Sequence, residues 1–305
     1  MKKRAGLWIL GCVLTAAGVA GTESAPSAAS SPQAQAAVAA FMQGPSVFIE
    51  NAGQWGAPEI RFALDGQGAN VGLTDRGPKF QLFRELPRPA EAAAQVADPA
   101  DPARAGDRAP APREMHAFGL LFDGAAAVSP EGRGLSERTY NYNVGPVEQH
   151  RSGVRSFESV WYSSVWPGVD LEVTGRRTGV KYTFHVAPGA DWRSVTLRYD
   201  GIQGLSLRAD GGLEIRVKEG WEPLVDAAPL VYQEVDGEKR PVAGAFRLVD
   251  DHAYGFDVTG AYDPARPLVI DPDIAWGVGP GGDSPPRAAW GQAAGMAFGG
   301  PTDGR

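Results

Sequence analysis

Hydrophobic and polar side chains alternate along two neighbouring stretches in the middle of the chain, residues 169–174 and 180–186. In a β-strand, a period of two places every second side chain on the same face, so each stretch predicts a strand with one apolar face. The polar residues Arg176, Arg177 and Thr178 separate the two stretches. Two alternating stretches joined by a short polar segment predict a β-hairpin.

The same alternation recurs in short stretches along most of the chain. These stretches are residues 60–64, 71–73, 80–83, 116–122, 195–199, 205–207, 213–217, 230–235, 242–249 and 254–258. Asp-Gly pairs, which favour the positive φ angles of tight hairpins, follow several of them, including Asp65 and Gly66, Asp200 and Gly201, Asp210 and Gly211, and Asp236 and Gly237. No long stretch has the 3.6-residue period of a helix. The chain is therefore predicted to be all-β, an antiparallel β-sandwich-like domain of many short strands with few or no helices.

Residues 1–20 predict a secretory signal peptide. Lys2, Lys3 and Arg4 precede an apolar run over residues 7–20, which suits a signal peptide but is short for a transmembrane helix of about 20 residues. The small residue Ala20 favours cleavage after it, and an uncleaved anchor is the alternative. Residues 9–12 loosely resemble a lipoprotein cleavage box, so lipidation of Cys12 is a second alternative.

Export would place the mature protein outside the cell or on the cell surface, with a periplasmic or lipid-anchored form as alternatives. Loss of residues 1–20 removes three positive charges from a net charge of −7 and leaves −10. An acidic chain has no electrostatic attraction to nucleic acid or anionic lipid. The predicted partner is a cell-surface or extracellular protein or glycan, with no nucleic acid and no membrane span in the mature chain.

Composition divides the rest of the chain. Residues 21–45 are rich in Ala, Ser and Pro and predict a disordered tether, and residues 46–272 form the all-β domain. An Ala-, Pro- and Asp-rich insert at about residues 86–113 predicts a disordered loop between two strands of that domain, with an interdomain linker as the alternative. Residues 273–305 form a Gly/Pro-rich tail.

Seven segments together resemble a known family. They are FIENAGQ at residues 48–54, YNYNVG at 140–145, WPGVD at 166–170, APGAD at 187–191, PLVYQE at 229–234, PVAG at 241–244 and YDPARPLVIDP at 262–272. In this order they resemble the uncharacterised all-β domain that precedes SBBP-type β-propeller repeats in bacterial secreted and cell-surface proteins. The resemblance implies an extracellular module and supplies no catalytic residues. Residues 281–283 and 290–297 look like the start of one degenerate propeller repeat.

The standard catalytic motifs are absent from the sequence, which has no His-Glu-x-x-His, no Gly-x-Ser-x-Gly and no P-loop. Cys12 is the only cysteine, so a mature chain without it cannot use thiolate chemistry. The four histidines lack a partner at a diagnostic spacing and are predicted to be solvated; they are His116, His150, His185 and His252. No catalytic and no metal-binding residue is therefore predicted.

Two pairs of carboxylates keep a glycoside hydrolase open as an alternative. Asp170 with Glu172, and Asp271 with Asp273, are spaced i and i+2. Such residues share one face of a strand at about 6.5–7 Å, within the range of about 5–9.5 Å that glycosidases use. The simpler interpretation is that Asp170 begins a strand and Asp271 ends one.

No cofactor is predicted, and calcium is the one alternative. Its candidate ligands are Asp98, Asp101 and Asp107 in the insert and Asp283, which follows Gly281 and Gly282 in the tail.

Trp192 and Trp221 adjoin predicted turns, so both could be exposed. Exposed aromatic rings can stack on sugars, whereas buried ones fill a β-core. The leading hypothesis is a non-catalytic exported bacterial β-module, a structural or interaction domain of the cell surface. The alternatives are a carbohydrate-binding module that uses Trp192 and Trp221, and a glycoside hydrolase.

Overall fold

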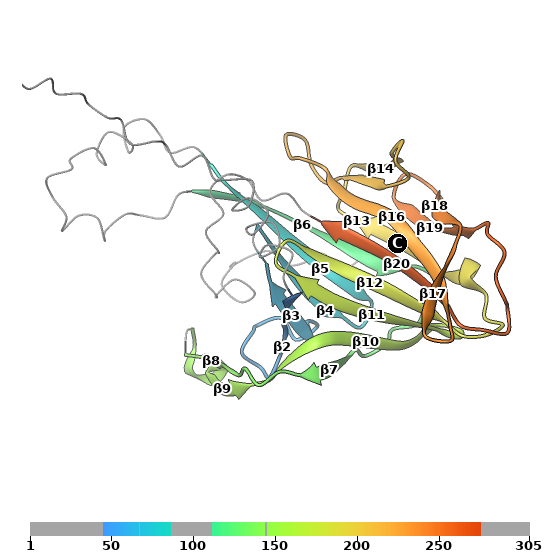
Figure 1. Ribbon diagram of the computed structural model, residues 1–305. Coiled ribbons are helices and arrows are strands. Elements are labelled where there is room, and N and C mark those ends of the chain that lie inside the picture. The colour runs from blue at the N-terminus through green and yellow to red at the C-terminus, as the bar shows by residue number, and fades with distance from the viewer. Residues whose placement is uncertain (1–44, 67, 87–111, 144, 276–305) are drawn as a thin grey trace, which may run out of the picture. The chain divides into compact units, whose positions relative to one another are not determined.

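The computed structural model describes residues 45–66, 68–86, 112–143 and 145–275, all of which belong to one compact unit (Figure 1). The predicted signal peptide and repeat start, the predicted tether except Pro45, and most of the predicted insert lie outside the described residues. Within the described part of the chain, no helix is long and apolar enough to cross a membrane.

The all-β prediction is confirmed. The strands are β1 (Pro45–Ser46), β2 (Phe48–Glu50), β3 (Phe62–Asp65), β4 (Ala69–Thr74), β5 (Gly77–Glu85), β6 (Arg113–Phe122), β7 (Glu131–Leu135), β8 (Tyr140–Tyr142), β9 (Arg151–Val154), β10 (Ser156–Trp166), β11 (Val169–Arg176), β12 (Gly179–Val186), β13 (Thr196–Asp200), β14 (Gly204–Leu207), β15 (Leu213–Arg216), β16 (Leu224–Val235), β17 (Glu238–Val242), β18 (Gly244–Leu248), β19 (Ala253–Val258) and β20 (Leu268–Ala275). The helical elements of the described residues are two single 3₁₀ turns, η2 (Val147–Gln149) and η3 (Trp192–Ser194).

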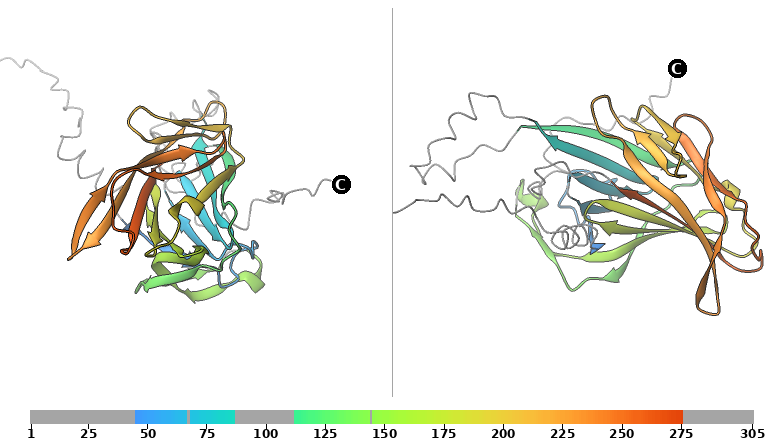
Figure 2. Two further views of the ribbon diagram at one scale, coloured as in Figure 1. Left: turned by 90° about the vertical axis from the view of Figure 1, so that its right-hand side faces the viewer. Right: turned by 45° about the horizontal axis from the view of Figure 1, so that its top comes forward.

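Eighteen of these strands join one antiparallel sheet, and β8 and β9 pair separately. Hydrogen-bonded neighbours run in the order β18, β19, β13, β6, β5, β4, β3, β2, β10, β11, β12, β20 and β16. Figure 2 shows this sheet curving around a common interior.

The two ends of this strand order are connected where the chain passes directly from β17 to β18. β17 pairs with β16 at one end of the sheet, and β18 pairs with β19 at the other end. Only Ala243 lies between β17 and β18, and its carbonyl accepts the N–H groups of Thr259 and Gly260, both at 2.9 Å. The sheet is therefore nearly closed, like a barrel, and the finer prediction of a sandwich is not confirmed.

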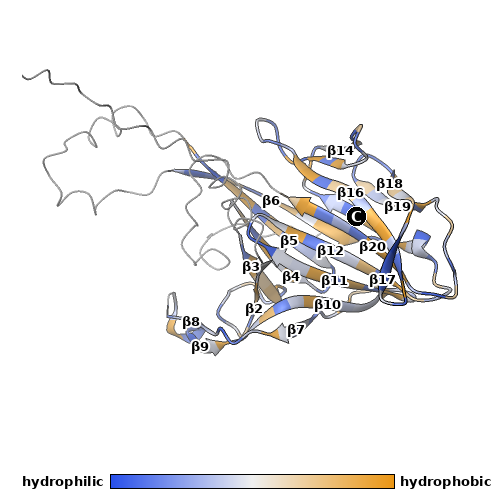
Figure 3. Ribbon diagram, viewed as in Figure 1, coloured by the Kyte–Doolittle hydropathy of each residue, from blue (hydrophilic) through white to orange (hydrophobic). Residues whose placement is uncertain are grey.

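The predicted central hairpin is confirmed. β11 and β12 pair without a break from Val169 opposite Val186 to Arg176 opposite Gly179. Along β11 every second residue is buried, and Figure 3 shows the matching bands of apolar and polar residues on β10 to β12. The buried face contributes to one continuous core in the interior of the sheet, because Leu171 and its apolar neighbours contact residues from most other strands.

Strands on either side of the Pro-rich insert pair with each other. β5 and β6 are neighbours from Lys79 opposite Gly119 to Glu85 opposite Arg113. The ends of residues 86–113 are therefore held side by side within one sheet.

Candidate functional site

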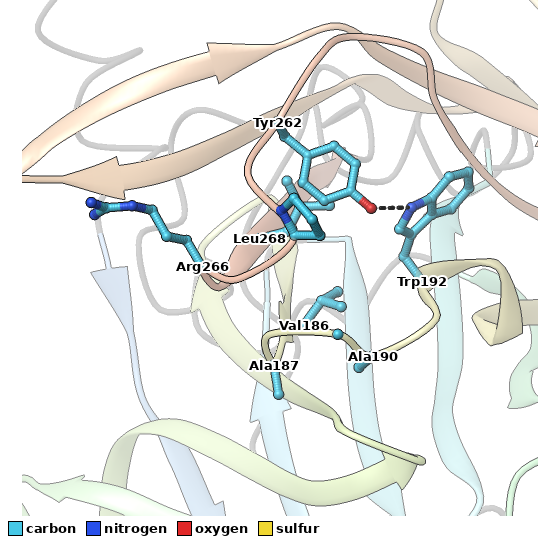
Figure 4. A pocket seen from close by; sticks show the side chains of 9 residues that line it. Val186, Ala187, Ala190, Trp192, Tyr262, Arg266 and Leu268 are labelled. Atoms are coloured by element: carbon cyan, nitrogen blue, oxygen red, sulfur yellow. Dashed lines mark hydrogen bonds between the residues drawn. The ribbon is translucent and has the colours of Figure 1, made fainter.

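A small cavity opens where the end of β12 meets the loop that leads into β20 (Figure 4). Its volume is about 120 Å³. One wall comes from β12, the loop after it and η3, and the other comes from the loop before β20. The lining residues are Val186, Ala187, Gly189, Ala190, Trp192, Tyr262, Pro264, Arg266 and Leu268. Two segments far apart in the sequence therefore build one site.

The 3₁₀ turn η3 fixes Trp192 against the cavity. Asp191 caps this turn, because its side chain accepts the Arg193 backbone N–H at 3.0 Å. Trp192 is buried, with 4% of its surface exposed, and its Nε1–H donates to the Tyr262 hydroxyl at 3.2 Å. The Arg193 guanidinium lies 4.3 Å from the centre of the indole ring. The indole is thus held as a rigid wall.

Gln233, a buried residue of β16, holds the opposite wall. Its Nε2 donates to the Asp263 carbonyl at 2.8 Å and reaches two more carbonyls of the same loop, at 3.2 and 3.3 Å. Its Oε1 accepts the Asp263 N–H at 2.8 Å. The two walls are tied together directly, because the Gly189 N–H donates to the Pro264 carbonyl at 2.9 Å. Gly189 has a φ of +75°, a conformation that glycine adopts without strain.

The chemistry of the cavity is that of a hydrogen-bond donor site with apolar walls. The Tyr262 hydroxyl already accepts a hydrogen bond from Trp192, so its own proton is available to a ligand. Arg266 borders the cavity with its guanidinium directed outward, away from Trp192 (Figure 4). Its side chain is 45% exposed and pairs with Asp263 at 3.4 Å. The lining includes no carboxylate, histidine, serine or cysteine.

The structure corrects the expectation that both candidate tryptophans could be exposed. Trp192 is buried and forms a wall of the cavity. Trp221 is half-buried and is not among the residues that line the cavity. The Arg84 guanidinium lies 4.7 Å from its ring centre, and Glu114 accepts two hydrogen bonds from Arg84. Neither ring is a bare platform, and sugar binding stays a prediction.

Sequence reasoning missed Tyr262, Arg266 and Gln233 as parts of a site. Their signal was the resemblance itself, because Tyr262 and Arg266 belong to the segment at residues 262–272 and Gln233 to the segment at residues 229–234. Nothing in either segment predicts contact with Trp192. That contact exists only because the strands bring the segments together.

Comparison with family models matches residues 48–273 to the Domain of unknown function (DUF7948). The chain belongs to this family. No curated protein and no solved structure matches the chain. The DUF7948 segment includes the whole cavity and Gln233.

The first carboxylate pair of the DUF7948 segment is engaged in local contacts. Asp170 accepts the Ser164 backbone N–H at 2.7 Å, and Glu172 lies 3.5 Å from His185 Nε2. The prediction of a solvated His185 is wrong in part, because the half-buried imidazole stacks on the indole of Trp161, with 4.8 Å between the ring centres. This face is a packed cluster of rings and charges.

The second pair lies on β20 and contacts side chains of β11 and β12. Asp271 pairs with Lys181 at 2.7 Å and accepts the Thr183 hydroxyl at 3.0 Å. Asp273 pairs with Arg176. Both carboxylates are therefore paired with other side chains of the protein, and hydrolysis stays a hypothesis.

The calcium ligands suggested by the sequence lie outside the described residues. Within the described ranges, Asp250, Asp251 and His252 place one ligand atom each within 4.8 Å of one another, a cluster the sequence analysis missed. Arg198 already occupies Asp250 through two hydrogen bonds, at 2.8 and 3.2 Å. A hydrogen bond of 2.8 Å joins Asp251 Oδ1 to His252 Nδ1. A cation would have to displace Arg198 from this turn.

Proposed function

We propose that this chain is an exported, non-catalytic β-domain of the bacterial cell surface that acts as an interaction module. The basic and apolar pattern of residues 1–20 supports export. The resemblance to domains that precede SBBP-type propeller repeats supports an extracellular setting. The observation that carries the proposal is the cavity between Trp192 and Arg266.

The size of the cavity favours one unit of a larger partner. Sites for free small molecules occupy about 300–1,000 Å³, whereas this cavity has about 120 Å³. A single side chain, or part of one sugar ring, is of that size. Such a site anchors a partner that makes most of its contacts elsewhere on the surface.

The lining favours a carboxylate-bearing unit. Val186 and Leu268 provide apolar walls, the Tyr262 hydroxyl provides a donor inside, and the Arg266 guanidinium provides a positive charge at the outer rim. The Tyr262 hydroxyl can donate to a carboxylate, Arg266 adds positive charge at the rim, and Val186 and Leu268 can contact an aliphatic stem. The proposed partner is an extracellular protein that inserts an acidic side chain.

The test is a titration of the full chain with glutarate and, separately, with glutaramide, its uncharged analogue. Binding is followed by the NMR resonance of the Trp192 indole N–H. We expect glutarate to shift this resonance, and Arg266→Gln to weaken its binding at least tenfold, or about 1.4 kcal/mol. Arg193→Gln is the matched control, because Arg193 is an exposed arginine beside Trp192 that does not line the cavity. Equal binding of the amide would contradict the proposal.

Carbohydrate binding is the second candidate, because the aromatic rings of Trp192 and Tyr262 line the same cavity. Glucuronate and glucose distinguish the two ideas in the same titration. Binding of glucose as strong as that of glutarate would favour the glycan module. A saturable hydrolytic activity that depends on one carboxylate would instead support the glycoside hydrolase.

A further inference from the structure

Within the part of the chain that the structure describes, four buried oxygen atoms in the interior of the sheet have no hydrogen-bond partner. They are Asp226 Oδ2 and the hydroxyl oxygens of Tyr182, Tyr199 and Tyr254. Each residue is at most 2% exposed. Buried polar groups without a partner are rare, because they lose their hydration and gain nothing in return.

These four groups come from four strands and meet in one region. Tyr182 lies on β12, Tyr199 on β13, Asp226 on β16 and Tyr254 on β19. β13 and β19 lie near one end of the strand order, whereas β12 and β16 lie near the other end. The curvature of the sheet therefore brings them together, and the rings of Tyr199 and Tyr254 stack at 6.0 Å.

The electrostatic interactions among these four residues also place them in one region. Burial raises the pKa of each tyrosine well above its usual value, and Asp226 raises it further in all three. The Tyr254 hydroxyl is near enough to lower the pKa of Tyr199 slightly, yet the two oxygens do not have the geometry of a hydrogen bond.

No basic side chain of the described residues pairs with Asp226. Its Oδ1 accepts the Asp273 backbone N–H at 2.9 Å, and its Oδ2 is the unpaired atom. Burial raises the pKa of this carboxyl well above its ordinary value, which favours its protonated form. With Asp226 in that form, the region offers four O–H groups, each of which can both donate and accept.

We propose that Asp226, Tyr182, Tyr199 and Tyr254 form an internal site that binds ordered water. Water both donates and accepts, which matches four groups that each do the same. A buried water commonly makes about three hydrogen bonds to groups that would otherwise be unpaired. An anion would meet no positive charge here, and a neutral carboxyl is a weak ligand for a cation.

The decisive test is the direction of the stability change in Tyr182→Phe. If water binds the Tyr182 hydroxyl, deleting that hydroxyl removes a hydrogen bond, and the denaturant midpoint falls. If the site is dry, the same change removes an unpaired hydroxyl, and the midpoint rises or stays the same, which would overturn the proposal. The matched control is Tyr162→Phe, because Tyr162 is equally buried and donates to the Thr74 carbonyl at 2.9 Å. Its midpoint must fall in either case.

A crystal structure of the full chain gives an independent readout. We expect separate water-sized density peaks within hydrogen-bond distance of Asp226 Oδ2 and of at least one tyrosine hydroxyl. Absence of density there would overturn the proposal. So would a cation or an organic molecule in its place, and native mass spectrometry would detect the latter as added mass.

Discussion

At the scale of single residues, the surroundings of a carboxyl group decide its behaviour. Lys218 and then Arg84 lower the pKa of the half-buried Glu114 to about 2. Arg198 and then the His252 backbone N–H lower that of Asp250 to about 2. Asp226 shifts in the opposite direction, because burial removes water and no cation replaces it. Glu114 and Asp250 thus form charge pairs, whereas burial favours the protonated form of Asp226.

The raised pKa of Asp226 predicts a pH-dependent stability. The folded state holds the Asp226 proton to higher pH than the unfolded state does, so this stability is complete below the unfolded pKa and is lost as pH rises through the folded pKa. Relative to Asp226→Asn, the wild-type free energy of unfolding should fall by up to about 1.4 kcal/mol per pH unit in that window. Urea unfolding of both proteins between about pH 4 and 8 measures this difference.

The groups that face Asp226 are the three tyrosine hydroxyls and the charge of Asp273, which lies on the neighbouring strand β20. The Asn variant keeps the tyrosines and Asp273, so their titration cancels in the comparison. A stability difference that does not change with pH would show that Asp226 is ionised in the folded protein.

At the scale of elements, the Asp-Gly signal predicted a hairpin correctly only where the two strands that flank it pair with each other. Asp236 and Gly237 both have positive φ, at 56° and 81°, and they join β16 to β17 as predicted. Asp200 and Gly201 carry the same signal, yet the tight hairpin predicted there is wrong, because β13 pairs with β6 and β19 and not with β14. Leu197 and Tyr199 of β13 are buried against strands that are distant in the sequence. The burial of these side chains outweighs the local preference for a hairpin.

The loop of the cavity depends on one side chain from another element. Gln233→Leu removes the hydrogen bonds that hold the loop before β20, so we expect a loss of about 1–3 kcal/mol in stability and weaker glutarate binding with Arg266 intact. Unfolding in urea and the Trp192 indole titration measure the two effects.

Gln54→Leu is the control for this change. Gln54 is equally buried and also bonds the backbone, at Glu50 and Ala52, but it does not line the cavity. It should lose stability and keep its glutarate affinity. If both variants lose affinity alike, Gln233 has no specific part in positioning the loop.

At the scale of the whole molecule, closure of the sheet depends on the crossing from β17 to β18. A Cβ atom at Gly244 would overlap the side chain of Val231, a core residue of β16. Only a glycine lets β18 pass so close to β16. The crossing therefore sets how tightly the two ends of the sheet approach each other.

Gly244→Ala should therefore destabilise the fold by about 1–3 kcal/mol through overpacking. Thermal and urea unfolding measure this loss. Gly119→Ala is the matched control in β6, because its nearest neighbour, the Pro78 carbonyl oxygen, lies 4.0 Å from the added atom. A Gly244 variant as stable as the Gly119 variant would show that the crossing tolerates a wider separation.

The sequence by itself determined many of the strands of this protein, the central hairpin and the all-β class, because a two-residue period is a local property that each segment carries alone. Only the tertiary structure decided that the sheet nearly closes, that Trp192 becomes a wall beside Tyr262, and that Asp226 meets three tyrosines. These outcomes depend on which distant strands pair. That choice follows from how all the apolar faces are buried together, and no single segment contains the information.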